Sequence, residues 1–186
     1  MGQFHFAVPP DSAQLLKQTL WNDAYICGIE GVPWECENSM SGGVLSVSRP
    51  VDTSGKLFLT CPTKALGFRT LSTCSLPPGT KRHPLFLELA RGSCYRARVQ
   101  SSTWERAGLT LGPRFGELLE SGTAQFLDAA QARNDIGTCS KAALQAIATL
   151  ENAIADLGES FALQSIAYSK QRETQLGTLL AGGVVP

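Results

Sequence analysis

Histidine and net charge are what this sequence most lacks. It has 2 histidines, and its 16 Lys and Arg residues balance its 16 Asp and Glu residues. Neither His5 nor His83 is spaced with Cys, Asp or Glu in the way that metal ligands are, so we expect no metal site. No basic run is longer than a few residues, which argues against nucleic acid as the main partner. The charge balance therefore favours neutral ligands or proteins as partners.

Long apolar runs and cofactor motifs are also missing. No stretch of about 18 apolar residues occurs, so we expect no membrane-spanning segment. The start, MGQFHFAVPP, lacks the basic and continuously apolar parts of a secretory signal. We therefore expect a soluble protein, cytoplasmic if this is the native N-terminus. No G-x-G-x-x-G, G-x-x-x-x-G-K-[ST] or G-x-S-x-G run is present, so we expect no nucleotide cofactor and no common serine hydrolase site.

The cysteines are spread along the chain without any C-x-x-C pair. The six are Cys27, Cys36, Cys61, Cys74, Cys94 and Cys139. In a chain of 186 residues with a fair apolar content, this spread favours buried free thiols over disulfides.

The first 80 residues have the short alternating segments and frequent turns of antiparallel strands. Strands are predicted at residues 3–8, 21–29, 44–49, 56–61 and 68–75. Residues 11–20 fit either a short helix or a loop. We therefore predict a β-sandwich or jelly-roll-like unit over residues 1–80.

Helical spacing replaces strand alternation from Pro84 onward. Helices are predicted over residues 84–104, from Pro113 and from Ser140. The third helix has a strict apolar face, made of Ala143, Ile147, Leu150, Ile154, Leu157 and Phe161. The prediction is an α+β fold in which a three-helix hairpin or bundle over residues 84–170 packs on the strands. Residues 171–186 have linker-like composition.

The first helix carries two features that need explanation. Arg96 lies on an otherwise apolar face, so it needs a carbonyl or carboxylate partner and the helix should lie buried between the strands and the other helices. A polar stripe beside that face contains Glu88, Arg91, Tyr95, Arg98 and Ser102. The stripe is either a solvated, salt-bridged flank, for example Glu88 to Arg91, or a polar contact surface.

Aromatic and planar polar side chains are the remaining candidates for a site. Sugar rings pack on flat aromatic rings while their hydroxyls bond to guanidinium and carboxylate groups. Trp34 follows Gly31 and Pro33, which predicts a loop that presents its ring. Trp and Tyr also fill cores, which is the competing interpretation. The candidate carbohydrate-binding residues are Trp34, Tyr25, Glu88, Arg91, Tyr95 and Arg98.

Two neighbouring carboxylates were considered for catalysis. Glu35 and Glu37 would share one side of an extended segment, and paired carboxylates can act as acid and base in glycosidases. Acids in such loops are far more often simply solvated. We therefore assign no catalytic residue and expect no enzyme activity from this chain by itself.

Three motifs resemble a known family. They are an E-G-[IV]-P-W stretch at residues 30–34, a V-x-R-x-V-D-x-S-G strand and turn at 47–55, and L-E-L-A-R-G-x-x-x-R-x-R-x-Q at 87–100. These are similar to the N-terminal, non-catalytic region of planctomycete endo-1,4-beta-xylanase-like proteins, which resemble glycoside hydrolase family ten. Together with the loop-presented ring of Trp34 and the neutral net charge, the motifs lead us to expect binding of β-linked plant polysaccharide, xylan or a cellulose-type glucan. The resemblance itself implies that residues 1–80 are like a carbohydrate-binding module and that the chain precedes a (β/α)8 catalytic domain, and it names no ligand. It supplies no binding residues.

A structural or dimerisation module without sugar binding is the alternative. The face from Ala143 to Phe161 could pair with its copy in a homodimer as readily as with helices of its own chain.

Overall fold

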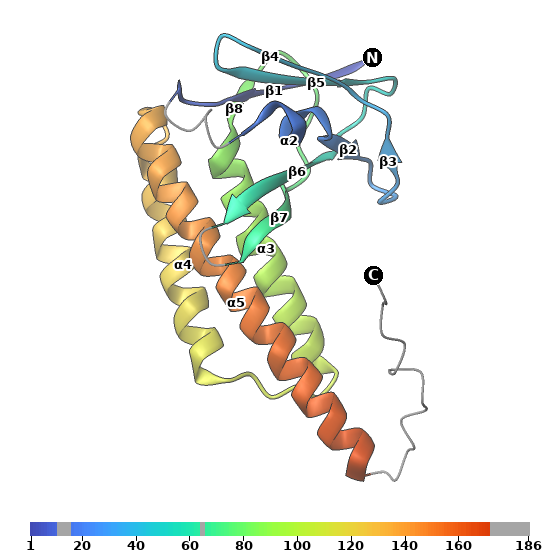
Figure 1. The fold of residues 1–186 in the computed structure, drawn as a ribbon, viewed down its shortest axis with the longest axis vertical. Coiled ribbons are helices and arrows are strands. Elements are labelled where there is room, and N and C mark those ends of the chain that lie inside the picture. The colour runs from blue at the N-terminus through green and yellow to red at the C-terminus, as the bar shows by residue number, and fades with distance from the viewer. Residues whose placement is uncertain (11–15, 64–65, 172–186) are drawn as a thin grey trace.

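The protein has a mixed α+β fold, as predicted. The computed structural model describes residues 1–10, 16–63 and 66–171. In this part of the chain, two four-stranded sheets lie at one end of an elongated molecule and three long helices extend from them (Figure 1). None of the helices described there is both long and apolar enough to cross a membrane.

The first sheet has the strand order β4-β5-β1-β8. Its strands are β4 (Glu37–Ser41), β5 (Val44–Arg49), β1 (Gly2–Ala7) and β8 (Arg82–Pro84). β1 is antiparallel to β5 and parallel to β8, so Phe6 lies between Leu45 and His83. Phe4, Phe6 and Leu45 are buried on one side of this sheet, as the alternation predicts.

β4 was not predicted, because its residues Glu-Asn-Ser-Met-Ser contain too few apolar side chains to alternate. Its position is fixed instead by Asn38, whose Nδ2 donates to the carbonyl oxygens of Trp21, Asn22 and Ala24 at 2.6–3.2 Å. A polar side chain therefore ties β4 to the segment that precedes β2.

The second sheet is fully antiparallel, in the order β3-β2-β6-β7. Its strands are β3 (Pro33–Trp34), β2 (Tyr25–Cys27), β6 (Lys56–Thr63) and β7 (Gly67–Ser72). The strand predicted over 21–29 is shorter, because Trp21 belongs to the short helix α2 (Gln18–Asn22). Of the segment 11–20, expected to be a short helix or a loop, residues 18–20 belong to α2, and residues 11–15 lie outside the described part. The predicted loop at Trp34 contains the two-residue edge strand β3.

The helices are α3 (Leu85–Arg106), α4 (Pro113–Gln131) and α5 (Ile136–Gln171). α3 contacts β7 and β8 on one side and α4 and α5 on the other, so it lies between the strands and the remaining helices. Arg96 forms an ion pair with Glu151 of α5, and Ser93 Oγ donates to the same carboxylate at 2.8 Å. The predicted need of Arg96 for a partner is confirmed. The linker predicted at 171–186 falls almost wholly outside the described residues.

One apolar cluster connects the sheets with the helices. It contains buried residues of both sheets, such as Leu45 and Leu71, together with Phe86 of α3 and Ile147 of α5. The core therefore continues across the boundary that the sequence suggests near residue 80. α3 approaches β7 so closely at Gly92 that a Cβ atom there would overlap the Ser72 carbonyl oxygen.

The apolar face of α5 is already used within the chain. Ala143, Ile147, Leu150 and Leu157 are at most 3% exposed. Phe161 stacks on Trp104 with 4.4 Å between the ring centroids. These contacts leave little of that face for a second copy.

Candidate functional site

The polar stripe of α3 does not form a uniform surface. The Glu88 side chain is buried, and its Oε2 lies 3.0 Å from Arg91 Nη1 while its Oε1 lies 3.9 Å from His83 Nδ1. Burial raises the pKa of Glu88, opposed by the charges of Arg91 and Lys81. The salt-bridge interpretation is thus correct for this pair, and Glu88 lies beneath the surface where a ligand could not reach it directly.

The other end of the stripe turns toward α4. Arg98 Nη2 donates to Thr123 Oγ1 of α4 at 3.2 Å. Tyr95, in contrast, is exposed and lies beside the second sheet, where the Lys56 ammonium is 5.6 Å from its ring centroid. The stripe therefore divides between two neighbours, α4 and the β3-β2-β6-β7 sheet.

Tyr25 belongs to the same side of that sheet as Lys56. Leu57, Leu59 and Cys61 of β6 are buried, whereas the alternate residues are half-buried and point to the opposite side. Tyr25 pairs with Phe58 across the strands, and their rings are stacked with centroids 5.2 Å apart and an angle of 1° between their planes. The parallel stack fixes both rings on the outer side of the sheet.

The same side continues along β6 and β7. The hydroxyls of Thr60 and Thr70 are 3.2 Å apart, and the exposed Phe68 lies opposite Pro62. Because Phe58 and Pro62 are four residues apart on one strand, the aromatic stack and Phe68 are separated by roughly 13 Å. We call this surface the aromatic face. It consists of Tyr25, Lys56, Phe58, Thr60, Phe68, Thr70 and Tyr95.

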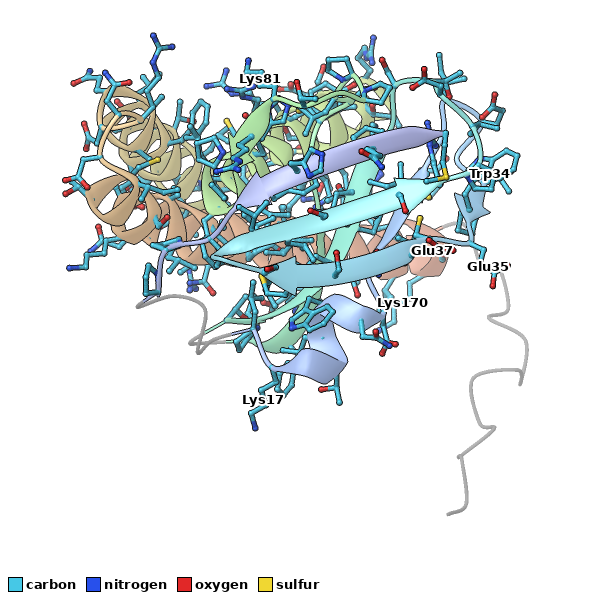
Figure 2. All side chains as sticks on the ribbon, turned by 90° about the horizontal axis from the view of Figure 1, so that it is seen from above. Lys17, Trp34, Glu35, Glu37, Lys81 and Lys170 are labelled. Atoms are coloured by element: carbon cyan, nitrogen blue, oxygen red, sulfur yellow. The ribbon has the colours of Figure 1, made fainter. Side chains whose placement is uncertain are left out.

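Trp34 is not part of the aromatic face. It pairs with Ile26, a buried residue on the inner side of the sheet, so the two side chains point to the side opposite Tyr25. Trp34 is 37% exposed because β3 is an edge strand. Figure 2 shows it beside Glu35 and Glu37 at one end of the molecule, and both carboxylates are exposed. The six predicted site residues therefore do not converge on one surface.

Sequence reasoning missed Lys56, Phe58, Phe68 and the two threonines of the aromatic face. The pattern was present, because Lys56, Phe58 and Thr60 alternate with Leu57 and Leu59. The apolar members of this alternation predict a strand, but the spacing alone does not indicate that the alternate members form a binding surface.

The outer side of the β4-β5-β1-β8 sheet is polar rather than aromatic. A shallow hollow of about 300 Å³ there is bordered by His5, Glu37 and Ser46, among other residues. His5 Nδ1 and Ser46 Oγ are 2.9 Å apart, a cross-strand hydrogen bond. This surface offers hydrogen bonds without a ring on which a sugar could stack.

The cysteine thiols are not activated as nucleophiles. All six are free thiols, and burial raises the pKa of Cys61 to about 12. Within residues 1–10, 16–63 and 66–171, no three His, Cys, Asp or Glu side chains form a group that could hold a metal ion. Among the surfaces described above, the aromatic face combines rings with hydroxyl groups and so suits binding through ring contacts and hydrogen bonds. Comparisons with protein families, with curated proteins and with solved structures find no match for this chain.

Proposed function

We propose that this chain is a non-catalytic module that binds a β-linked plant polysaccharide, xylan or a cellulose-type glucan, on its aromatic face. The observation that carries the proposal is the parallel Tyr25–Phe58 stack on the outer side of the sheet, with Lys56, Tyr95 and the two threonines around it. Sugar C–H groups pack against such rings, while hydroxyl and ammonium groups bond to sugar hydroxyls.

The geometry also suits an extended ligand. Aromatic rings at both ends of the face, with Thr60 and Thr70 between them, follow the direction of β6 and β7. An extended polysaccharide could contact both ends at once. The motif resemblance to xylanase-like proteins supports the same ligand class. In that interpretation the β-sandwich-like part binds the polymer and the helices lead to a following catalytic domain.

Affinity is expected to be modest. A few ring contacts and hydrogen bonds, which must first release water, give roughly −5 to −7 kcal/mol net. This corresponds to dissociation constants on the order of 10 to 200 μM. Calorimetry with xylohexaose and cellohexaose is the direct test.

The matched variants are Tyr95→Ala on the aromatic face and Trp34→Ala on the other side of the sheet. Both residues are exposed, so neither change should unfold the protein. Tyr95→Ala should weaken binding by about threefold to tenfold, the usual contribution of one aromatic contact. Trp34→Ala should bind like the parent. The reverse result would move the site to Trp34, and no binding of either sugar at millimolar concentration would refute the proposal.

The absence of catalysis is a separate part of the proposal. Glu35 and Glu37 are exposed at the edge of the molecule, whereas the paired carboxylates of glycosidases flank the bond that they cleave. Reducing-sugar assays on xylan and cellulose should stay at background. Turnover that Glu35→Gln abolishes would contradict this.

The dimerisation alternative is less favoured because the face of α5 on which it depends is packed inside the chain. Ile147 and Leu150 belong to the same core as the sheets. Size-exclusion chromatography with light scattering should therefore give the mass of a monomer. A stable dimer that binds neither xylohexaose nor cellohexaose would favour the alternative.

A further inference from the structure

A second hollow lies on the inner side of the β3-β2-β6-β7 sheet, and its lining differs in chemistry from the aromatic face. It is a groove of about 500 Å³ between the end of β6 and the first half of α5. Its residues are Cys61, Pro62, Thr63, Leu71, Phe86, Lys141, Leu144, Gln145, Ile147 and Ala148. We propose that this groove binds a small molecule with an apolar body and a carboxylate head, such as a medium-chain fatty acid.

The interior of the groove is apolar and held in place by the core. Leu71, Phe86 and Ile147 are at most 3% exposed and come from a strand and two different helices. Leu144 and Ala148, one turn apart on α5, are half-buried. The volume falls within the roughly 300 to 1,000 Å³ of ordinary small-molecule sites. An alkyl chain that fills the groove would cover the surface of Leu144 and Ala148 that is still exposed to water.

Among the described residues that line the groove, Lys141 is the only charged one. Lys141 is exposed, and none of the described acidic groups lies within ion-pair distance of its ammonium. The carboxylate of Asp135 interacts with the charge of Lys141 only over a longer distance. It accepts hydrogen bonds from Thr138 Oγ1 and from two backbone N–H groups. The exposed amide of Gln145 adds a hydrogen-bond donor to the same lining, whereas the hydroxyl of Thr63 already donates to the Gly67 carbonyl oxygen at 2.8 Å. A carboxylate would therefore find a free cation and hydrogen-bond donors, whereas a cationic head would be repelled.

The Cys61 thiol does not alter this charge balance. Its pKa is raised by burial to about 12, so it is neutral at physiological pH. The described lining of the groove thus combines an uncharged apolar interior with the cation of Lys141, the arrangement that selects an amphiphilic anion. This inference does not depend on polysaccharide binding, because the two surfaces lie on opposite sides of one sheet.

Calorimetric titration with sodium decanoate, at pH 7.5 and below its micelle-forming concentration, tests the proposal on the full chain. Decyltrimethylammonium, with the same alkyl chain and the opposite charge, is the matched ligand. We expect saturable one-to-one binding of decanoate and binding of the cation at least threefold weaker. Lys141→Gln should weaken decanoate about twofold to fivefold, as expected for one exposed ion pair.

Two further variants complete the design. Ala148→Phe places a ring in the groove and should abolish measurable decanoate binding. Lys170→Gln removes a charge of the same kind near the other end of α5 and should leave binding unchanged. If decanoate does not saturate, or if the cation binds equally well, the proposal is wrong. If the filling variant fails to fold, the comparison of the two ligands on the parent protein still decides it.

Discussion

Gly92 allows the sharpest prediction about the fold, because one substitution there sets two opposing effects against each other. Replacing glycine by alanine inside a helix normally stabilises the helix by about 1 kcal/mol. At Gly92, the new Cβ would overlap the Ser72 carbonyl oxygen and lie 2.7 Å from the Ser72 carbonyl carbon and 3.1 Å from the carbonyl carbon of Thr73. These are backbone atoms of β7 and the residue after it, so they cannot rotate away as a side chain would.

The overlap should outweigh the gain in helix propensity. Extra atoms in a packed interior cost about 1–3 kcal/mol and occasionally more, and a backbone-to-backbone contact belongs at the upper end. We expect Gly92→Ala to lower the free energy of unfolding by about 2 kcal/mol net. With a urea dependence of about 1–3 kcal/mol per molar, the unfolding midpoint should fall by roughly 1 M.

Gly116→Ala in α4 is the matched control. Gly116 is exposed, and a Cβ there would meet nothing within 4 Å. Gly116→Ala should raise the free energy of unfolding by up to about 1 kcal/mol. The same chemical change should therefore have effects of opposite sign at the two positions. Urea unfolding followed by circular dichroism measures both. A Gly92→Ala protein as stable as the parent would show that α3 does not approach β7 as closely as described.

Four further predictions concern buried polar groups. Arg96→Met should cost about 2–3 kcal/mol of stability by leaving the Glu151 carboxylate buried with Ser93 alone, and adding Glu151→Leu should recover part of the loss in a urea double-mutant cycle. Burial lowers the pKa of His83 below its ordinary 6.5, so the unfolded chain takes up the proton first and His83 should contribute a loss of stability as pH falls through that range. His83→Gln should remove this contribution. Glu88, whose pKa burial raises above 4.5, should act in the opposite direction, adding stability as pH falls toward that value; Glu88→Gln should remove this gain in the same pH series. Cys61 should resist iodoacetamide at pH 8 until the protein unfolds, and rapid alkylation seen by mass spectrometry would contradict its burial.

The long elements could be predicted from the sequence because their apolar spacing extends over many residues. The starts of α3 and α4 lie at or next to Pro84 and Pro113, and the strand at Val44–Arg49 has the predicted bounds. The anion needed by Arg96 was also predictable, since a guanidinium on an apolar helical face must be compensated. That the anion is Glu151, 55 residues away, depends on how α3 and α5 pack and is not encoded locally.

The candidate site was harder to predict because it depends on strand register. A two-residue strand such as Pro33–Trp34 has no alternation to show which side its residues face. Only its pairing with Ile26 places Trp34 on the side opposite Tyr25. β8 could not be predicted from the sequence for a related reason. It forms a strand only because residues 82–84 pass beside β1.

The position of β1 has a consequence for how the chain can fold. β1 lies in the interior of its sheet, between β5 and β8, so residues 2–7 complete their hydrogen bonds only when residues 82–84 are in place. Loop closure over such a separation is slow compared with forming a hairpin. β4 and β5 can pair early, because they are neighbours in the sequence. The pairing of β1 with β8 can form only after all strands of the second sheet have been synthesised. Since α3 begins directly after β8, the step that completes the first sheet also positions the helix on which the rest of the molecule assembles. Slowing that step would leave the edge of β1 open to a neighbouring chain, which makes the rate of this closure a determinant of aggregation during synthesis.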